Sequence, residues 1–257
     1  MLGENILPSY LKTVDLGNNF NQPIGENVLP NSLKTINFGC NFNQSIGENV
    51  LPSSLESINF GCKFNQPIGE NILPNYLKTI EFGWKFNQPI GENVLPNSLK
   101  TIKFRCRFNQ PIGENILPAS IKRVEIGDSY GYFESGYDHS ISALYNLDHL
   151  KHLSIHTETD IEIDVDRLPS SLKYLSTSNA DIALSPNPES QRMWFSVILI
   201  NLQRLSDVTY SILRELPYGY IGKYKVIGSD TIDGIKYNIL INPEYYQPRS
   251  NAKSARK

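Results

Sequence analysis

The chain has 257 residues, a formal net charge of −2 at pH 7 and a pI of about 6.1. This charge balance excludes the broadly basic surface that attracts nucleic acid or anionic lipid. The longest apolar run, Val197 to Ile200, is far shorter than the ~20 residues of a membrane-spanning helix.

Localisation is predicted from the N-terminus and the cysteines. The first residues, Met1 to Asn5, lack the basic and apolar regions of a signal peptide. Three cysteines in a chain of this length do not make a disulfide framework. We therefore expect an intracellular, cytoplasmic protein in a reducing compartment, with no membrane, nucleic-acid or metal partner.

The first half of the chain repeats one unit of 22 residues. Phe-Asn-Gln begins five times at this interval, at Phe20, Phe42, Phe64, Phe86 and Phe108. Leu-Pro recurs in the same register, at Leu7, Leu29, Leu51, Leu73, Leu95 and Leu117. Periods of this length are typical of solenoids, in which each unit packs only against its neighbours.

Within a unit, the pattern predicts one short strand. Ile36 and Phe38 alternate with polar Thr35 and Asn37, as in a half-buried strand. The following glycine allows a tight turn, and a proline such as Pro23 suits an irregular return segment. We therefore predict a mostly β solenoid whose 22-residue coils each contain a short strand, a turn and an irregular return.

One asparagine holds the same position in five units: Asn21, Asn43, Asn65, Asn87 and Asn109. An amide stacked in this way can donate to the backbone of one coil and accept from the next. We interpret these residues as a structural ladder; the alternative is a row of merely exposed polar side chains.

The string Leu-Pro-x-Ser-Leu-Lys-x-Ile-x-Phe-Gly followed by Phe-Asn-Gln-Pro-Ile resembles the FNIP repeat, a family abundant in social amoebae and in giant DNA viruses that infect amoebae. The match runs from Leu2 to about Ile126, and two degenerate copies begin near Leu150 and Leu168. The resemblance implies a leucine-rich-repeat-like solenoid for protein–protein contact, placed in some members behind an F-box. It implies no catalytic residues.

We divide the chain into residues 1–126 (regular repeats), 127–186 (a loop insertion and two degenerate repeats), 187–248 (a degenerate C-terminal closing region) and 249–257 (a disordered basic tail). In the closing region, Met193 to Ile200 fits a short helix or a buried strand, and Tyr224 to Ile241 reads as a hairpin. We expect the uncovered first coil, Leu2 to Leu16, to self-associate, to bind a partner or to continue an upstream domain.

Like charges also recur once per unit. Acidic side chains stand at Glu4, Glu26, Glu48, Glu70, Glu92 and Glu114, and basic ones at Lys12, Lys34, Lys78, Lys100 and Lys122, a row that Glu56 interrupts. We expect both rows to be solvated edges; a track for a polyanion or a basic peptide is the alternative.

The positions that vary between units are candidates for recognition. Trp84 has the basic residues Lys63, Lys85 and Arg107 near it, and Lys103 occupies the outward position of its strand. Aromatic and cationic side chains of this kind are enriched at interface hot spots. We predict a protein-binding surface here; the alternative is that Trp84 only shields its neighbours from water.

A second candidate contact site lies between Gly127 and Ser140. Ile121 and Leu150 occupy equivalent positions but lie 29 residues apart, so seven extra residues form a loop. The loop carries the aromatic residues Tyr130, Tyr132, Phe133 and Tyr137. They are expected either to contact a partner or to fold back over the flank of the solenoid.

The cysteines and histidines carry no predicted chemistry. Cys40 and Cys62 are expected on adjacent coils, within reach of a disulfide, but we expect free thiols. The four histidines, His139, His149, His152 and His156, have spacings that do not suit a metal site.

Enzymatic motifs are lacking: the chain has no Gly-rich phosphate loop, no His-Glu-x-x-His and no nucleophile elbow. We therefore predict a non-enzymatic scaffold for protein–protein interaction that needs no cofactor. The alternative is the substrate-recognition part of an F-box-type ubiquitin-ligase adaptor that lacks its F-box.

Overall fold

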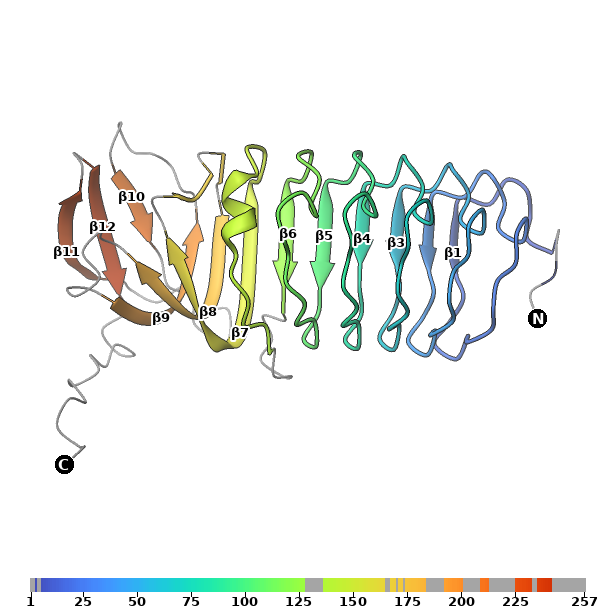
Figure 1. The fold of residues 1–257 in the computed structure, drawn as a ribbon, viewed down its shortest axis with the longest axis horizontal. Helices are drawn as coiled ribbons and strands as arrows, with labels where there is room; N and C mark the ends of the chain where they lie inside the picture. Colours follow the sequence, from blue (N-terminus) through green and yellow to red (C-terminus); the bar gives the residue numbers. More distant parts are fainter. Residues whose placement is uncertain are drawn as a thin grey trace, which may run out of the picture.

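The computed structural model describes residues 3, 6–127, 136–164, 167–169, 171–172, 174–183, 192–200, 209–212, 225–232 and 235–241. Its strands lie side by side along the long axis of Figure 1. They are β1 (Thr13–Asp15), β2 (Thr35–Asn37), β3 (Ser57–Asn59), β4 (Thr79–Glu81), β5 (Thr101–Phe104), β6 (Arg123–Ile126), β7 (His152–Asp164), β8 (Tyr174–Ala183), β9 (Arg192–Ile200), β10 (Thr209–Ile212), β11 (Lys225–Ile232) and β12 (Ile235–Ile241).

Strands β1 to β8 form a parallel sheet in which each strand pairs with the next one in the chain. The register matches the repeat, since Ile36 of β2 lies opposite Ile58 of β3 and Ile58 lies opposite Ile80 of β4. One strand per coil, stacked in parallel, defines a leucine-rich-repeat-like solenoid. The predicted fold class is therefore confirmed.

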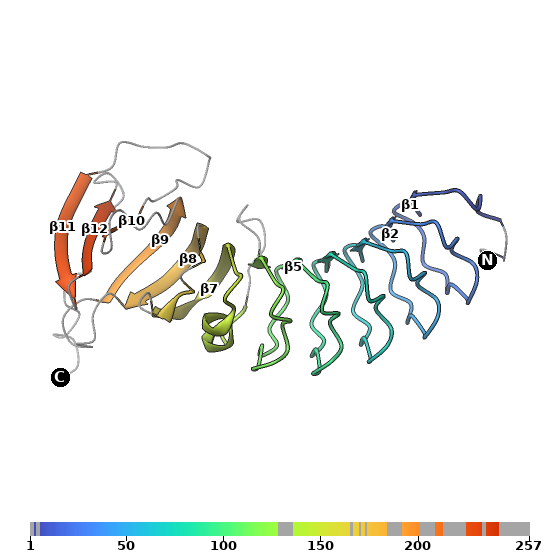
Figure 2. The same cartoon turned by 90° about the horizontal axis from the view of Figure 1, so that it is seen from above.

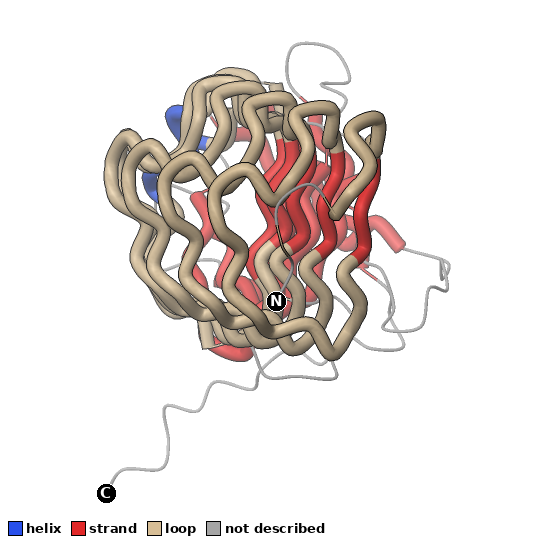
Figure 3. Tube along the Cα trace, turned by 90° about the vertical axis from the view of Figure 1, so that its right-hand side faces the viewer, coloured by secondary structure: helices blue, strands red, loops and turns tan. Residues whose placement is uncertain are grey.

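The coils stack along an arc with β1 to β8 on its inner side and the return segments on its outer side (Figure 2). Viewed from the N-terminal end, the strands superpose on one wall of the coils and loops form the remaining walls (Figure 3). The short helix η1 (Ser142–Asn146), a 3-10 helix, lies on the wall opposite the strands. The sequence predicted an irregular return at this place, not a helical turn.

Two columns of stacked aromatic rings fill the core of the regular coils. One column contains the last apolar residue of each strand segment, from Phe38 to Phe104, and the other contains the Phe of Phe-Asn-Gln, from Phe20 to Phe108. The ring centroids of Phe42 and Phe64 lie 6.0 Å apart, and those of Phe38 and Phe42 in one coil lie 4.4 Å apart. These rings are buried with the Leu and Ile rows, so a coil completes its core only when it has neighbours.

The turn after each early strand brings the backbones of successive coils very close together. A Cβ on Gly61 would lie 1.8 Å from the carbonyl oxygen of Gly39, and Gly61 has φ of +75°. Only glycine tolerates both conditions. The return segments contain a second left-handed position, held by the asparagine of each Gly-Glu-Asn: Asn27, Asn49, Asn71, Asn93 and Asn115.

The predicted degenerate repeats continue the sheet. Leu153 in β7 lies opposite Val124 in β6, and Leu175 in β8 lies opposite Leu153. Strand β9 then pairs antiparallel to β8, so Met193 to Ile200 belongs to a strand, one of the two predicted alternatives. The predicted hairpin is present as the antiparallel pair β11 and β12, with β10 beside β12 in a three-stranded sheet. Residues 249–257 lie outside the described residues.

Candidate functional site

The repeated asparagines form a ladder of hydrogen bonds that joins the coils. The Oδ1 atom of Asn65 accepts the backbone N–H of Asn87 at 2.8 Å and the Nε2 group of Gln88 at 3.2 Å. The same pattern holds at Asn21, Asn43 and Asn87. These asparagines therefore link successive coils as acceptors, and the predicted donation to the backbone is not among the hydrogen bonds of the described residues.

The ladder continues past the insertion through residues that do not match the motif. The backbone N–H of Asp138 donates to Oδ1 of Asn109 at 3.2 Å, and the Nε2 atom of His139 lies 3.3 Å from the carbonyl oxygen of Asn109. The ring of Tyr137 stacks on Phe108 with 6.2 Å between centroids. Tyr137, Asp138 and His139 therefore replace Phe-Asn-Gln in this coil.

Tyr137 is 0% exposed, so the prediction that it contacts a partner is wrong. Its ring follows the alternative, in which an aromatic residue folds back against the solenoid. The seven extra residues precede Tyr137, and Tyr130, Tyr132 and Phe133 lie outside the described residues. Their role stays a prediction.

A second ladder was not predicted from the sequence. The hydroxyl of Ser54 donates to the carbonyl oxygen of Leu33 in the previous coil at 2.6 Å. Equivalent bonds link Ser32 to Leu11, Ser98 to Leu77, Ser120 to Leu99 and Ser171 to Leu150. The available signal was the repeated Ser-Leu pair, which places a hydroxyl beside the carbonyl that precedes each strand.

Glu56, which interrupts the row of lysines, forms ion pairs with two of them. Glu56 lies 2.9 Å from the Nζ atom of Lys34 and 2.6 Å from that of Lys78, in the coils on either side. Hydrogen bonds from Lys34 and then Lys78 lower the pKa of Glu56 to about 2. This edge is therefore a partly paired row and not a run of repelling charges.

On the inner side of the arc, the outward side chains of the strands neutralise one another. Lys103 lies 3.2 Å from Glu125, which also lies 2.5 Å from Arg123, and Arg105 lies 2.5 Å from Glu81. Lys103, a predicted binding residue, is thus engaged within the sheet.

The turns beyond β3, β4 and β5 carry the other predicted binding residues. Lys63, Lys85 and Arg107 are exposed, and we call these three residues the cationic row. Backbone hydrogen bonds hold them one coil apart, because the N–H of Lys85 donates to Cys62 at 2.9 Å and that of Arg107 donates to Trp84 at 3.2 Å. Trp84 is 42% exposed beside them. Among the described residues, no ion pair engages the cationic row.

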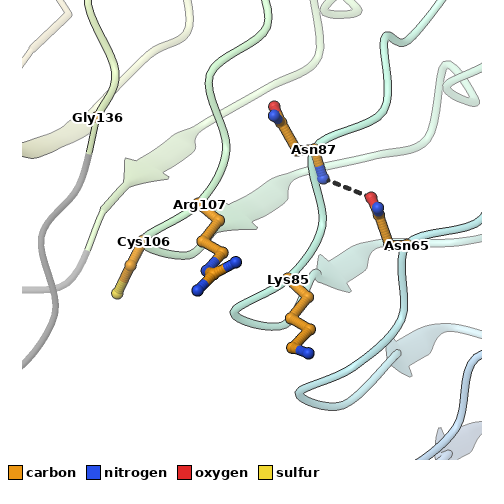
Figure 4. Close-up of a pocket in the computed structure, with 6 residues that line it drawn as sticks. All are labelled: Asn65, Lys85, Asn87, Cys106, Arg107 and Gly136. Atoms are coloured by element: carbon orange, nitrogen blue, oxygen red, sulfur yellow. Dashed lines mark hydrogen bonds between the residues drawn. The ribbon is translucent and has the colours of Figure 1, made fainter.

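A shallow hollow of about 380 Å³ adjoins this row. It is lined by Asn65, Lys85, Asn87, Cys106, Arg107 and Gly136. Figure 4 shows the side chains of Lys85 and Arg107 extending from successive turns, with Asn65 and Asn87 beside them. The sequence marked these asparagines only as structural. The Lys-Phe-Asn and Arg-Phe-Asn spacing was the available signal, since alternate residues of extended backbone project to one side.

All three cysteines are free thiols. Burial, and then a hydrogen bond with the thiol of Cys40, raise the pKa of Cys62 to about 11. Over the described ranges, no group of three or more His, Cys, Asp and Glu side chains is arranged to hold a metal ion. None of the helices in that part of the chain has the length and hydrophobicity needed to span a bilayer.

These features define the class of the molecule: a parallel β-solenoid of the leucine-rich-repeat type whose coils are joined by polar ladders. The FNIP repeat model matches residues 2–41, 20–63 and 64–107. The match to the FNIP repeat model thus spans residues 2–107, the part of the chain in which the sequence motifs predicted it.

Among solved structures, the chain is similar to the crystal structure of CroV588, from a giant virus, described as a novel circular LRR protein structure. The sequences are 36% identical, the TM-score is 0.49, and the match covers 75% of this chain and 33% of that one. The chain thus matches about a third of the length of that protein. No curated protein matches the chain.

Proposed function

We propose that this protein is a non-enzymatic scaffold that binds a partner protein through Trp84 and the cationic row. The observation that carries the proposal is the coincidence of three properties on one surface. The side chains are exposed, they occupy positions where the repeats differ, and ladders hold the backbone beneath them. The cationic row also lacks an ion pair among the described residues.

A rigid support matters because association is opposed by the entropy of ordering the groups at the interface. The stacked turns already fix the backbone of each binding residue, so mainly side-chain freedom is lost on binding. Trp84 supplies a large apolar surface, and the neighbouring cations supply long-range attraction and orientation. Aromatic and arginine side chains are the usual anchors of such interfaces.

The proposal is tested by affinity capture from amoebal cytosol, followed by binding measurements with each purified candidate. We expect a Trp84→Ala, Lys85→Glu, Arg107→Glu variant to lose a specific partner, with affinity falling at least about a hundredfold. Ligase subunits among the captured proteins would support the narrower role of an F-box-type adaptor.

The matched control is a Tyr76→Ala, Lys12→Glu, Lys122→Glu variant. It removes one exposed aromatic residue and reverses two exposed charges, but at positions away from the hollow. Its affinity should stay within about threefold of the parent affinity. A partner lost equally from both variants, or from neither, would contradict the proposed surface.

A further inference from the structure

The ladder fixes the orientation of the amide groups of Asn65 and Asn87, two of the residues that line the hollow. The Oδ1 atom of Asn65 accepts from Asn87, and the Oδ1 atom of Asn87 accepts the backbone N–H of Asn109 at 2.8 Å. A backbone N–H can only donate, so the oxygen must occupy the side of the amide that faces the next coil. The NH2 group is thereby directed away from these bonds. No described residue accepts a hydrogen bond from the NH2 group of Asn65 or Asn87.

Among the described residues that line the hollow, the polar groups that the ladder leaves unengaged on Asn65, Asn87, Lys85 and Arg107 are all donors. Asn65 and Asn87 present NH2 groups, Lys85 an ammonium and Arg107 a guanidinium. Among the residues that the structure describes, no carboxylate lines the hollow. A group that satisfies these four donors must accept several hydrogen bonds and carry negative charge, as a carboxylate does.

The spacing of the cationic row favours an extended ligand. Lys63, Lys85 and Arg107 lie one coil apart, which corresponds to about 4.8 Å between neighbouring backbones. Alternate side chains of an extended peptide lie about 6.7 Å apart. Flexible Lys and Arg side chains bridge this difference, so an extended acidic segment that crosses successive coils can meet the row with more than one carboxylate.

The short length of the row favours a peptide over a nucleic acid. The equivalent residues in the two preceding coils are the neutral Asn19 and Asn41, so the charge is confined to three turns. The protein as a whole is slightly acidic, and Glu81 and Glu125 on the inner side of the arc are paired with basic residues. A polynucleotide would need a longer basic footprint.

We infer that the hollow binds a carboxylate, and that the cationic row as a whole binds an extended acidic segment of a protein. The inference rests on the proposed binding function and specifies the chemistry of the partner.

The experiment measures fluorescence anisotropy of a fluorescein-labelled hexa-aspartate peptide titrated with the full chain. Hexa-asparagine and hexa-lysine peptides and an oligouridylate are the comparison probes. We expect saturable binding of hexa-aspartate alone, weakened in about 0.5 M NaCl. A Lys85→Gln, Arg107→Gln variant should lose at least about tenfold in affinity, whereas a Lys12→Gln, Lys122→Gln control should change less than about twofold.

A second variant tests the NH2 group of Asn65 while keeping the hydrogen bond that joins the coils. Asn65→Asp keeps a side-chain oxygen for the N–H of Asn87 but replaces the NH2 group by a second oxygen. We expect this variant to fold and to bind hexa-aspartate at least about tenfold more weakly, while Asn21→Asp, on the same ladder but away from the hollow, binds as the parent does.

Unchanged affinity in Asn65→Asp and in the Lys85 and Arg107 variant would overturn the inference. So would absence of hexa-aspartate binding, or tighter binding of the oligouridylate. If the cytosolic partner depends on Trp84 but not on Lys85, Arg107 or Asn65, the inference fails, and of the proposed function the part that stands is a scaffold that binds a partner through Trp84.

Discussion

At the scale of the residue, one coil keeps the ring stack and the backbone hydrogen bond of the ladder although its side chains differ from the motif. Asp138 replaces the ladder asparagine after the insertion, and its backbone N–H still donates to Asn109. Tyr137 replaces phenylalanine and keeps the ring stack, but it adds a hydroxyl. Within the described residues, that hydroxyl is buried with no hydrogen-bond partner. The nearby backbone of Ile112 acts to lower the pKa, but it does not meet the geometry of a hydrogen bond to this hydroxyl.

Replacing Tyr137 by phenylalanine is therefore expected to stabilise the protein by about 1 kcal/mol, because it removes an unpaired buried hydroxyl. Burial raises the pKa of Tyr137 from 10.0 to about 12. Folding thus favours the neutral form of the tyrosine. The stability that comes from this difference in pKa is fully present below pH 10 and is lost as the pH rises from 10 towards 12. Urea unfolding of both proteins at about pH 9 and about pH 11.5 measures this difference.

At the higher pH, the free energy of unfolding of Tyr137→Phe should exceed that of the parent by more than it does at the lower pH. A variant less stable than the parent at both pH values would show that the hydroxyl has a favourable partner.

At the scale of the element, the turn after each strand sets how closely two coils approach. Gly17 and Gly61 have almost the same backbone conformation, with φ of +80° and +75°. A Cβ on Gly17 would meet nothing within 4 Å, whereas one on Gly61 would collide with the carbonyl oxygen of Gly39. A comparison of alanine substitutions at the two glycines therefore distinguishes the strain of the left-handed backbone from the steric clash with the neighbouring coil.

Gly17→Ala is expected to destabilise the protein by about 1–2 kcal/mol, the strain of a left-handed alanine. Gly61→Ala should be worse by at least about 3 kcal/mol, because the backbone of one coil must move. Equal shifts of the two denaturation midpoints would mean that the coils separate at this turn without loss of packing.

The strands and their order could be predicted from the sequence because the alternation of apolar and polar residues is a local pattern, and it recurs every 22 residues. The ladder asparagines could be predicted from the sequence because an asparagine recurs at the same position in five units. Tyr137 was placed in the loop because Tyr-Asp-His conceals the position of Phe-Asn-Gln, and seven extra residues can be inserted at several points. The donors in the hollow were not predicted, since the direction of each amide depends on the N–H of the next coil. The link from Glu56 to Lys34 and Lys78 likewise depends on side chains of three different coils.

At the scale of the whole molecule, the stacked coils are interchangeable units. Asn41 is followed by Phe42, and the next unit, after Lys63, begins in the same way with Phe64. The pairing of β2 with β3 is repeated residue for residue in the pairing of β3 with β4. The coil that contains β3 therefore presents to its neighbours nearly the same two faces as the coil that contains β2.

Deletion of residues 42–63 should therefore leave a folded protein that is shorter by one coil. We expect β-rich circular dichroism, a smaller radius of gyration by X-ray scattering and a reduced urea m-value, because less surface is buried. Deletion of residues 42–52 removes half a coil and brings β3 to β2 without a return segment, so it should abolish cooperative unfolding. Similar behaviour of the two deletions would contradict a modular stack.

The near identity of successive coils also bears on how the gene changes. Gain or loss of one whole 22-residue unit would leave every coil with neighbours that it fits without further substitution. Every gained unit lengthens the molecule by about 4.8 Å and adds one turn at the position of Lys63 and Lys85. A single codon at that position then decides whether the added turn is neutral, as at Asn41, or cationic. The charge of this surface can thus vary between closely related genes while the fold stays the same.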